Sequence, residues 1–212
     1  MIRNLLTWLV PILLLAPGFS PAETAPPEAL VKNVTDEVLA ILKADKGIQS
    51  GNQQRAVALI ETKVAPHFDF GRMTSLAVGR GWRQADAQQQ KALTEEFRTL
   101  LVRTYANSLT AYRNQTVSFK PSPKPPQGDE VTVHSQINKP GAQPIALDYS
   151  LARTDAGWKV FDVAIANVSL VTSYRSSFAS AIEQGGINGL LKSLQEKNRR
   201  SETASPVPPP AT

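Results

Sequence analysis

The sequence contains no cysteine and only two histidines, His67 and His134. Without cysteine the chain has no disulfide, no thiolate nucleophile, no iron–sulfur cluster and no cysteine-ligated zinc. A lone histidine is also a poor metal site, because structural and catalytic metals need three or four converging ligands. The sequence signatures of serine hydrolases, zinc proteases, phosphate-binding loops and dinucleotide-binding folds are missing as well. Most familiar catalytic and metal chemistries therefore lack residues that they need.

Long apolar runs are absent after the first residues of the chain. The run Leu5–Ala16 spans 12 residues, follows the positive Arg3, and is followed by small residues before Ala22. This pattern predicts a secretory signal peptide over residues 1–22, cleaved near Ala22. The run is too short for a membrane anchor, which needs roughly 20 apolar residues. We therefore expect an exported chain of about 190 residues, whose net charge falls from +5 to +4 with the loss of Arg3.

The rest of the chain divides by periodicity into a helical first half and a strand-rich second half. Together they predict one domain over residues 23–200, a size that buries roughly 70% of the unfolded surface. The tail over 201–212 holds four prolines and is expected to be disordered. In the first half, apolar residues recur at helical spacing. They predict helices over 28–46, 51–64, a short segment through Met73 and Leu76 that ends at Gly79, and 86–113, with a loop over 80–83.

The helix over 86–113 is the best defined of these elements. Asp86 and Gln89 form a capping-box-like start, and apolar residues then recur at steps of three and four. Its apolar face is rich in aromatics, which bury large areas and keep a polar hydroxyl available at a cavity rim. Composition does not tell whether the interior is filled, because the same apolar stripes describe a solid core and a pocket wall.

From Gln115 onward the apolar period changes to two, which is typical of strands. The strand around 158–165 is apolar at nearly every position, which predicts a central strand covered on both faces. The predicted fold is α+β, with a helical N-terminal half packed on a curved antiparallel four-stranded sheet and closed by C-terminal helices. The elements predicted in this half are strands around 117–119, 131–137, 145–151 and 158–165, in meander order, and helices over 170–183 and 187–198, separated by Gly185 and Gly186.

A few polar residues are candidates for catalysis. A carboxylate inside an apolar cone, such as Asp162, or Asp148 beside Tyr149, would have a raised pKa and could act as a base. The alternative for Asp162 is that it pairs with a basic group or caps backbone at the sheet edge. His67 and Asp69 could form a dyad, or take surface and capping roles.

Basic residues concentrate in residues 72–113, where seven stand against three acidic residues. This local excess equals the net charge that we expect for the whole exported chain. A solvated helix face explains such an excess, and docking to an acidic partner or to anionic head groups is the alternative. We expect no nucleic-acid binding, because an aromatic and basic reading platform is missing. His134 is expected to face solvent from its strand.

Several motifs follow one another in the same order as in a known family. In the first half they are Pro66-His-Phe-Asp-Phe-Gly-Arg-Met-Thr74, Ala77-Val-Gly79, Trp82-Arg83, and Phe97-Arg-Thr-Leu-Leu-Val-Arg-Thr-Tyr105-Ala106. In the second half they are Asp148-Tyr149, Gly157-Trp-Lys-Val-Phe-Asp-Val163, Val168-Ser-Leu-Val171, Tyr174-Arg-Ser-Ser-Phe178, and Gly189-Leu-Leu191. Over residues 28–198 this series resembles the MlaC family of periplasmic phospholipid-binding proteins, also called the toluene-tolerance auxiliary family.

The resemblance implies a soluble periplasmic phospholipid carrier, with a cone like that of nuclear-transport-factor-like domains extended by helices. Residues 23–200 would then be a single lipid-binding domain, monomeric, with no catalytic residue, no metal and no cofactor besides the phospholipid cargo. The implied partners are an outer-membrane lipoprotein–porin complex and an inner-membrane ABC transporter with an MCE-domain protein. Transport between them would maintain outer-membrane lipid asymmetry. Because the head group can stay in water, we expect no cluster of charges at the pocket.

The candidates for lipid contact are chosen by the face of the helix or strand on which they lie, and not from contacts known in the family. Each of them could equally be plain core. Two other functions stay open: an isomerase or hydrolase of a nuclear-transport-factor-like cone that uses Asp148, Asp162 or Tyr149, and a non-lipid exported scaffold with a filled core. The candidates are Leu101, Tyr105 and Leu109 on the long helix, Phe119, Val133, Leu147, Tyr149 and Val163 on the sheet, and Val168 and Tyr174 at the mouth.

Overall fold

The computed structural model describes residues 25–120 and 128–203. The predicted signal peptide, residues 1–22, lies outside the described residues. The last helix continues to Thr203, so the first three residues of the predicted tail over 201–212 are helical and the rest lies outside the described part. Within the two described ranges, no helix combines the length and the apolar character that crossing a membrane requires.

Side-chain caps divide the N-terminal helices differently from the prediction. The helix predicted over 28–46 ends at Ala44, because Asp45 is extended and its side chain accepts hydrogen bonds from two backbone N–H groups of a second, short helix. The next helix starts later than predicted, after Asn52, whose side chain caps it. The α-helix stops at Leu59, and the rest of the predicted range continues as a π-helical turn. The elements are α1 (Pro27–Ala44), α2 (Lys46–Gln49), α3 (Gln53–Leu59), a π-helical turn η1 (Ile60–Val64) and a 3₁₀ turn η2 (Ala65–His67).

The two following helices confirm the predicted positions. Asp69 caps α4 (Phe70–Val78), which ends as predicted at Gly79, where φ is +63°. The segment predicted as a loop over 80–83 is instead part of a 3₁₀ helix, η3 (Gly79–Gln84). Asp86 and Gln89 form the predicted capping box, and α5 (Ala87–Thr110) follows, ending three residues before the predicted boundary.

The second half forms an antiparallel sheet in the order β1-β2-β3-β4-β5. The α+β class is confirmed, and the sheet has five strands instead of four, because the two residues of β5 pair with the end of β4. The strand predicted as central is therefore next to the edge. The strands are β1 (Thr116–Phe119), β2 (Glu130–Asn138), β3 (Ile145–Thr154), β4 (Gly157–Ile165) and β5 (Val168–Ser169).

Both faces of β4 are nevertheless covered, as its apolar sequence predicts. Val160 and Val163 belong to the buried cluster between the sheet and the start of α1. Phe161 packs instead against the cluster of the helices, at the place where the register between β3 and β4 shifts. Alternate side chains of a strand point to opposite faces, so β4 supplies two cores, and the bulge at Phe161 brings Val160 and Val163 into the same cluster although they are three residues apart.

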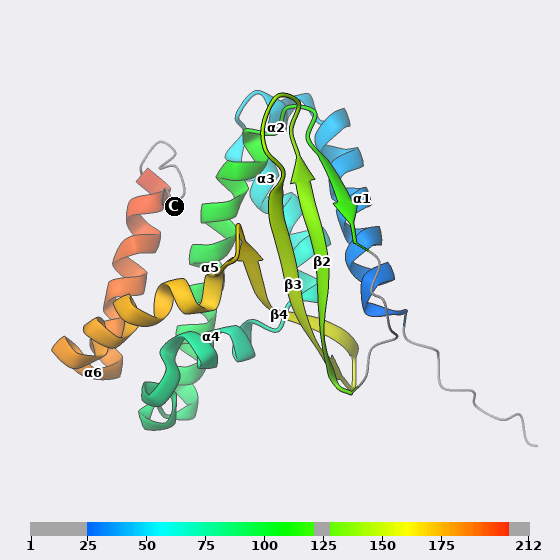
Figure 1. Ribbon diagram of the computed structural model, residues 1–212. Helices are drawn as coiled ribbons and strands as arrows, with labels where there is room; N and C mark the ends of the chain where they lie inside the picture. The colour runs from blue at the N-terminus through cyan, green and yellow to red at the C-terminus, as the bar shows by residue number, and fades with distance from the viewer. Residues whose placement is uncertain (1–24, 121–127, 204–212) are drawn as a thin grey trace, which may run out of the picture.

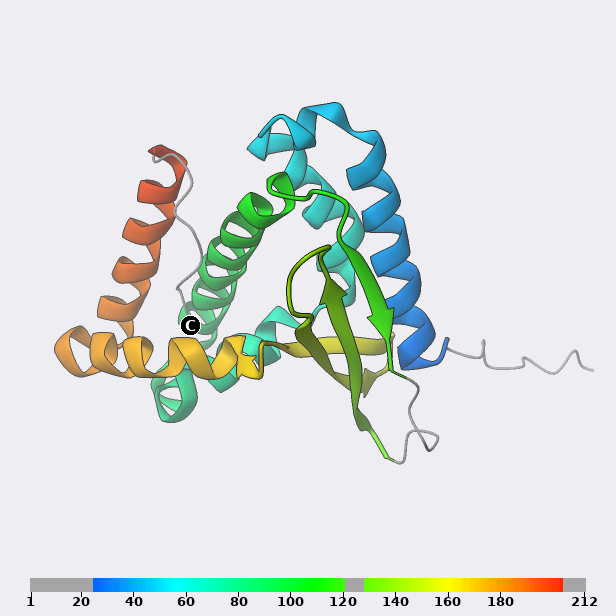
Figure 2. The ribbon, with the colours of Figure 1, turned by 45° about the horizontal axis from the view of Figure 1, so that its top comes forward.

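The chain ends in α6 (Leu170–Thr203), which is two helices joined at a kink. Gly185 and Gly186 are non-helical, and Gly186 has a φ of +64°, a conformation that glycine adopts without steric cost. This confirms the two predicted closing helices and the break between them. Both views of the molecule place α5 between the sheet and the second part of α6, while α1 runs along β1 and β2 (Figure 1, Figure 2).

Candidate functional site

An apolar pocket of about 310 Å³ lies between α1, the sheet and the C-terminal end of α5. Its largest contribution comes from α1, where apolar side chains three or four residues apart form one stripe. Leu30, Val34, Val38 and Leu39 of this stripe are only half-buried, because the neighbouring elements do not fill the space in front of them. The volume is within the range of about 300–1,000 Å³ that is usual for small-molecule sites. A scaffold with a filled core, one of the open alternatives, does not fit this cavity.

The polar groups in the pocket wall favour their neutral forms. Burial raises the pKa of Tyr149 to about 12, against a smaller opposing effect of its hydrogen bond with Thr35. Burial is also the main reason that the pKa of His67 is lowered, with the charge of Lys159 acting in the same direction. At neutral pH the wall is therefore mostly hydrocarbon with uncharged polar groups. Such a surface suits an apolar chain and offers nothing to an ion.

The structure places two of the ten predicted contacts, Leu109 and Tyr149, in the wall of this pocket. Four others, Phe119, Val133, Leu147 and Val163, lie in or against the cluster between the sheet and α1. Leu101 and Tyr174 belong to the helical cluster around Phe97, and Tyr105 lies between that cluster and the cluster of α1, α2 and α3. Val168 is 47% exposed. That lipid touches these residues stays a prediction.

Sequence reasoning missed most of the wall, because it used the apolar stripe of α1 only to define a helix. The stripe itself was visible in the sequence, and so was its lack of aromatic residues. Ile137 on β2 and Phe68 after η2 complete the wall, and no local pattern marks them as lining residues.

The carboxylates proposed as catalytic bases do not line the pocket. Asp162 accepts a hydrogen bond from the Ser169 hydroxyl at 2.5 Å and one from the Val171 backbone N–H at 3.2 Å, which joins β4 to the start of α6. The capping role weighed for Asp162 is therefore confirmed. Asp148 contacts His134 Nδ1 at 3.0 Å, and the His134 side chain is 55% exposed, as predicted. Neither carboxylate is placed to act on a molecule in the pocket.

The proposed dyad of His67 and Asp69 is not formed either. Asp69 Oδ1 accepts a hydrogen bond from the Arg72 backbone N–H at 2.9 Å, so its carboxylate caps α4. His67 lies in the wall of the apolar pocket. In the described residues, no three histidine or acidic side chains converge as metal ligands would.

Several basic residues of the segment 72–113 are engaged within the fold. Arg72 contacts Glu130 at 2.6 Å and lies 3.6 Å above the ring of Phe161. Arg98 pairs with Glu61. These pairs join α4 to β2 and α5 to η1. The excess of basic residues in this segment is therefore explained only in part by a helix face that points into solvent.

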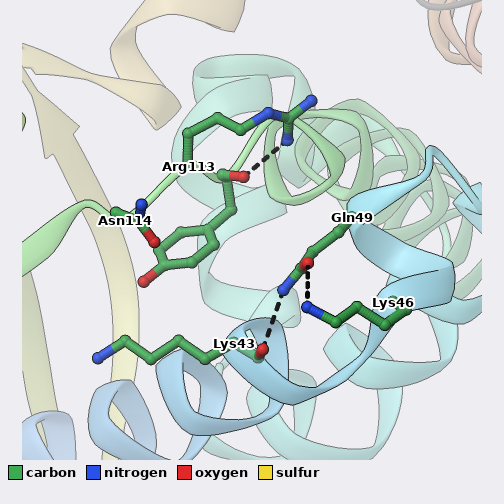
Figure 3. Close-up of a pocket in the computed structure, with 6 residues that line it drawn as sticks. Lys43, Lys46, Gln49, Arg113 and Asn114 are labelled. Atoms are coloured by element: carbon green, nitrogen blue, oxygen red, sulfur yellow. Dashed lines mark hydrogen bonds between the residues drawn. The ribbon is translucent and has the colours of Figure 1, made fainter.

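A second pocket, of about 370 Å³, borders the first and is polar. Tyr112 belongs to the walls of both pockets. Lys43 and Lys46 come from the end of α1 and from α2, and Arg113 comes from the residues after α5, so two distant stretches of chain supply three cationic side chains to the lining of one pocket (Figure 3). Sequence reasoning expected no cluster of charges at the apolar pocket, and no Lys, Arg, Asp or Glu is among the described residues that line it; the three cations lie in the neighbouring pocket, which the sequence did not predict.

Sequence comparison identifies relatives over most of the chain. A family model described as MlaC protein matches residues 32–196. The toluene tolerance protein ttg2D of Pseudomonas putida is 26% identical over 169 residues, which cover 79% of this chain and 78% of that protein. The intermembrane phospholipid transport system binding protein MlaC of Haemophilus influenzae is 22% identical over 180 residues, which cover 82% of this chain and 83% of that protein.

A solved structure is similar to this fold as a whole. It is a phospholipid-binding protein from Ralstonia solanacearum, determined in complex with a phospholipid. The two structures superpose with a TM-score of 0.78 at 40% sequence identity, over 84% of this chain and 99% of the other.

Proposed function

The chain belongs to the MlaC family, and we propose on this basis that it is a phospholipid carrier that shelters acyl chain in the apolar pocket beneath α1. The observation that carries the proposal is the cavity of about 310 Å³ whose wall consists of hydrocarbon and neutral polar groups. A relative with 40% identity and a similar fold was solved with a phospholipid, which supports the same cargo here.

The physical case for a carrier rests on the cost of exposing an acyl chain to water. A chain of about 15 methylenes costs on the order of 12 kcal/mol in water, at about 0.8 kcal/mol for each methylene. A dry apolar pocket removes most of this cost while the lipid travels between membranes. The charged head group does not need the same shelter, because it is well solvated in water.

We further propose the route that the family resemblance implies. The carrier would act in the periplasm and exchange phospholipid between an outer-membrane lipoprotein–porin complex and an inner-membrane ABC transporter with an MCE-domain protein. This exchange would maintain outer-membrane lipid asymmetry, and the chain would act without catalysis. The predicted signal peptide over residues 1–22 and the relative named as part of an intermembrane phospholipid transport system support this route.

Native mass spectrometry with lipid extraction tests the cargo. The full chain is exported to a bacterial periplasm, purified without detergent and compared with Val34→Glu, which puts a charge into the apolar wall. Asn33→Glu, at an exposed position on the same helix, is the matched control. We expect phospholipid at a fixed stoichiometry in wild type and control, and its loss in Val34→Glu. Wild-type protein that carries no lipid and takes none from vesicles would contradict the proposal.

A further inference from the structure

We propose that the polar pocket lined by Lys43, Lys46 and Arg113 binds the phosphate of the phospholipid whose acyl chain occupies the apolar pocket. This inference rests on the proposed function and adds a recognition site for the head group. It assigns a ligand class, a phosphate ester, to a cavity outside the apolar pocket.

The two pockets share a boundary that suits a molecule with a charged end and an apolar end. Tyr112 belongs to both walls. On α1, Leu42 faces the apolar pocket and the next residue, Lys43, faces the polar pocket. After α5, Asn114 lines the polar pocket and the next residue, Gln115, lines the apolar pocket. Because glycerol joins the phosphate to the acyl chains, the phosphate must lie next to the apolar pocket, and the pocket that the cations line meets the apolar pocket at Tyr112.

The three cations have no carboxylate partner within the described ranges. The Lys46 ammonium donates to the neutral Gln49 Oε1 at 3.2 Å. Arg113 Nη1 donates to two backbone carbonyls, at 3.0 and 2.7 Å, which leaves other donors of its guanidinium for a ligand. The nearby Asp45 does not neutralise them, because its carboxylate contacts Arg55 Nη1 at 3.0 and 3.1 Å. A phosphate would supply the missing negative charge through charge-assisted hydrogen bonds.

Another explanation for cations at this place is that they cap helix ends. The C-terminal ends of α1, α2 and α5 meet here, and helix carbonyl ends attract positive charge. However, the end of α1 is already satisfied by Gln49 Nε2, which donates to the Leu42 and Lys43 carbonyls at 2.7 and 3.0 Å. Arg113 does the same for α5. Lys43 and Lys46 are exposed and are not needed for either end, so they are free to meet an anion.

The test measures which lipid the protein extracts from vesicles of phosphatidylcholine that contain a minor share of diacylglycerol with the same acyl chains. The two lipids differ by the phosphate-bearing head group, and these vesicles carry no net charge, so non-specific attraction is small. The variant is Lys43→Glu/Lys46→Glu. The control, Arg83→Glu/Lys192→Glu, makes the same change of net charge at exposed positions on η3 and α6. Lys43→Arg/Lys46→Arg keeps the charges and should behave as wild type.

We expect the ratio of extracted phospholipid to diacylglycerol, relative to control, to fall at least about tenfold in Lys43→Glu/Lys46→Glu, a loss of about 1.4 kcal/mol. Extraction of diacylglycerol should stay unchanged. The preference of the wild type should also weaken with added salt, because the contact is between charges at a solvent-exposed site.

Three results would overturn the proposal, for different reasons. An unchanged ratio in Lys43→Glu/Lys46→Glu would remove the head-group site and leave the carrier function intact. If inorganic phosphate alone saturates a site that this variant abolishes while the ratio stays unchanged, the site would serve free phosphate instead. If wild type and control extract neither lipid, the proposed function itself fails, and the head-group site fails with it.

Discussion

Two regions of this molecule are each bordered by the apolar stripe of a helix, but one region is filled by side chains and the other contains a cavity. Around Phe97, the rings of Tyr174 and Phe178 meet it edge-on with ring centres 5.0 and 5.2 Å away, and Phe97 and Phe178 are at most 1% exposed. Beneath α1, the stripe is aliphatic and faces a cavity of about 310 Å³. In the first space, Phe97 and two rings from α6 fill the contact. In the second, α1 brings no aromatic ring, and the rings that face it, Phe68, Tyr112 and Tyr149, line the space without filling it. A stripe alone predicts burial, and only the opposing surface decides between core and pocket.

The strongest expected effect comes from emptying the filled region. Phe97→Ala should lower the free energy of unfolding by about 3–5 kcal/mol, because it removes a ring that is packed against two others and leaves a cavity. Urea unfolding followed by circular dichroism measures this loss. A loss below about 1 kcal/mol would mean that the helical cluster is as loosely filled as the pocket, and the contrast between the two regions would not hold.

The second effect tests whether the pocket is dry. Burial favours the protonated form of Tyr149 in the folded chain, with a pKa of about 12 against 10.0 in the unfolded chain. This contribution to stability is complete below pH 10 and is lost as the pH rises from about 10 to 12. It amounts to roughly 2–3 kcal/mol, at about 1.4 kcal/mol for each pKa unit. Tyr149→Phe should flatten this part of the stability curve.

The absorbance of tyrosinate, compared between wild type and Tyr149→Phe, gives the pKa of this residue directly. Tyr105, whose pKa is also raised to about 12 by burial, lies against the filled cluster and serves as an internal reference. A Tyr149 that ionises near 10 while Tyr105 does not would indicate water in the pocket.

The third effect probes how tightly the helical side is filled. A Cβ atom on Gly81 would lie 2.7 Å from Ile182 Cδ1 and 3.4 Å from Val78 Cγ1. Gly81→Ala should therefore destabilise the fold by about 1 kcal/mol, the lower end of the usual cost of overpacking, since the end of the Ile182 side chain can turn away. Thermal unfolding measures the change. No change, or a gain in stability, would show that this side also contains unused space.

The same contrast explains how much the sequence could predict. The capping box at Asp86, the stop at Gly79 and the kink at Gly185 and Gly186 depend on neighbours in the chain, and all were predicted correctly. The alternation after Gln115 likewise gave the antiparallel meander. These features are local, so a linear pattern contains the information that determines them.

Features that depend on distant partners were missed. The two residues of β5 are too few to show a period, and Asp162 Oδ2, which accepts from the Ser169 hydroxyl, helps to hold them in place. The wall of the pocket was missed because α1 differs from the long helix in what faces it. The cluster of Lys43, Lys46 and Arg113 joins residues about 70 positions apart, which no spacing rule in the sequence would have brought together.

The smallest expected change in stability accompanies a large change in binding, and it separates pocket from core most directly. Val38→Phe adds bulk to the α1 stripe, as Gly81→Ala adds bulk to the helical core, but here the added atoms enter open space. The free energy of unfolding should therefore change by no more than about 0.5 kcal/mol, the range of substitutions that neither break nor overfill a core. Phospholipid retained on purification should fall, because the ring takes the place of the acyl chain. If Val38→Phe destabilises the fold as much as Gly81→Ala does and keeps its lipid, the space beneath α1 is packed core, and the cargo binds elsewhere.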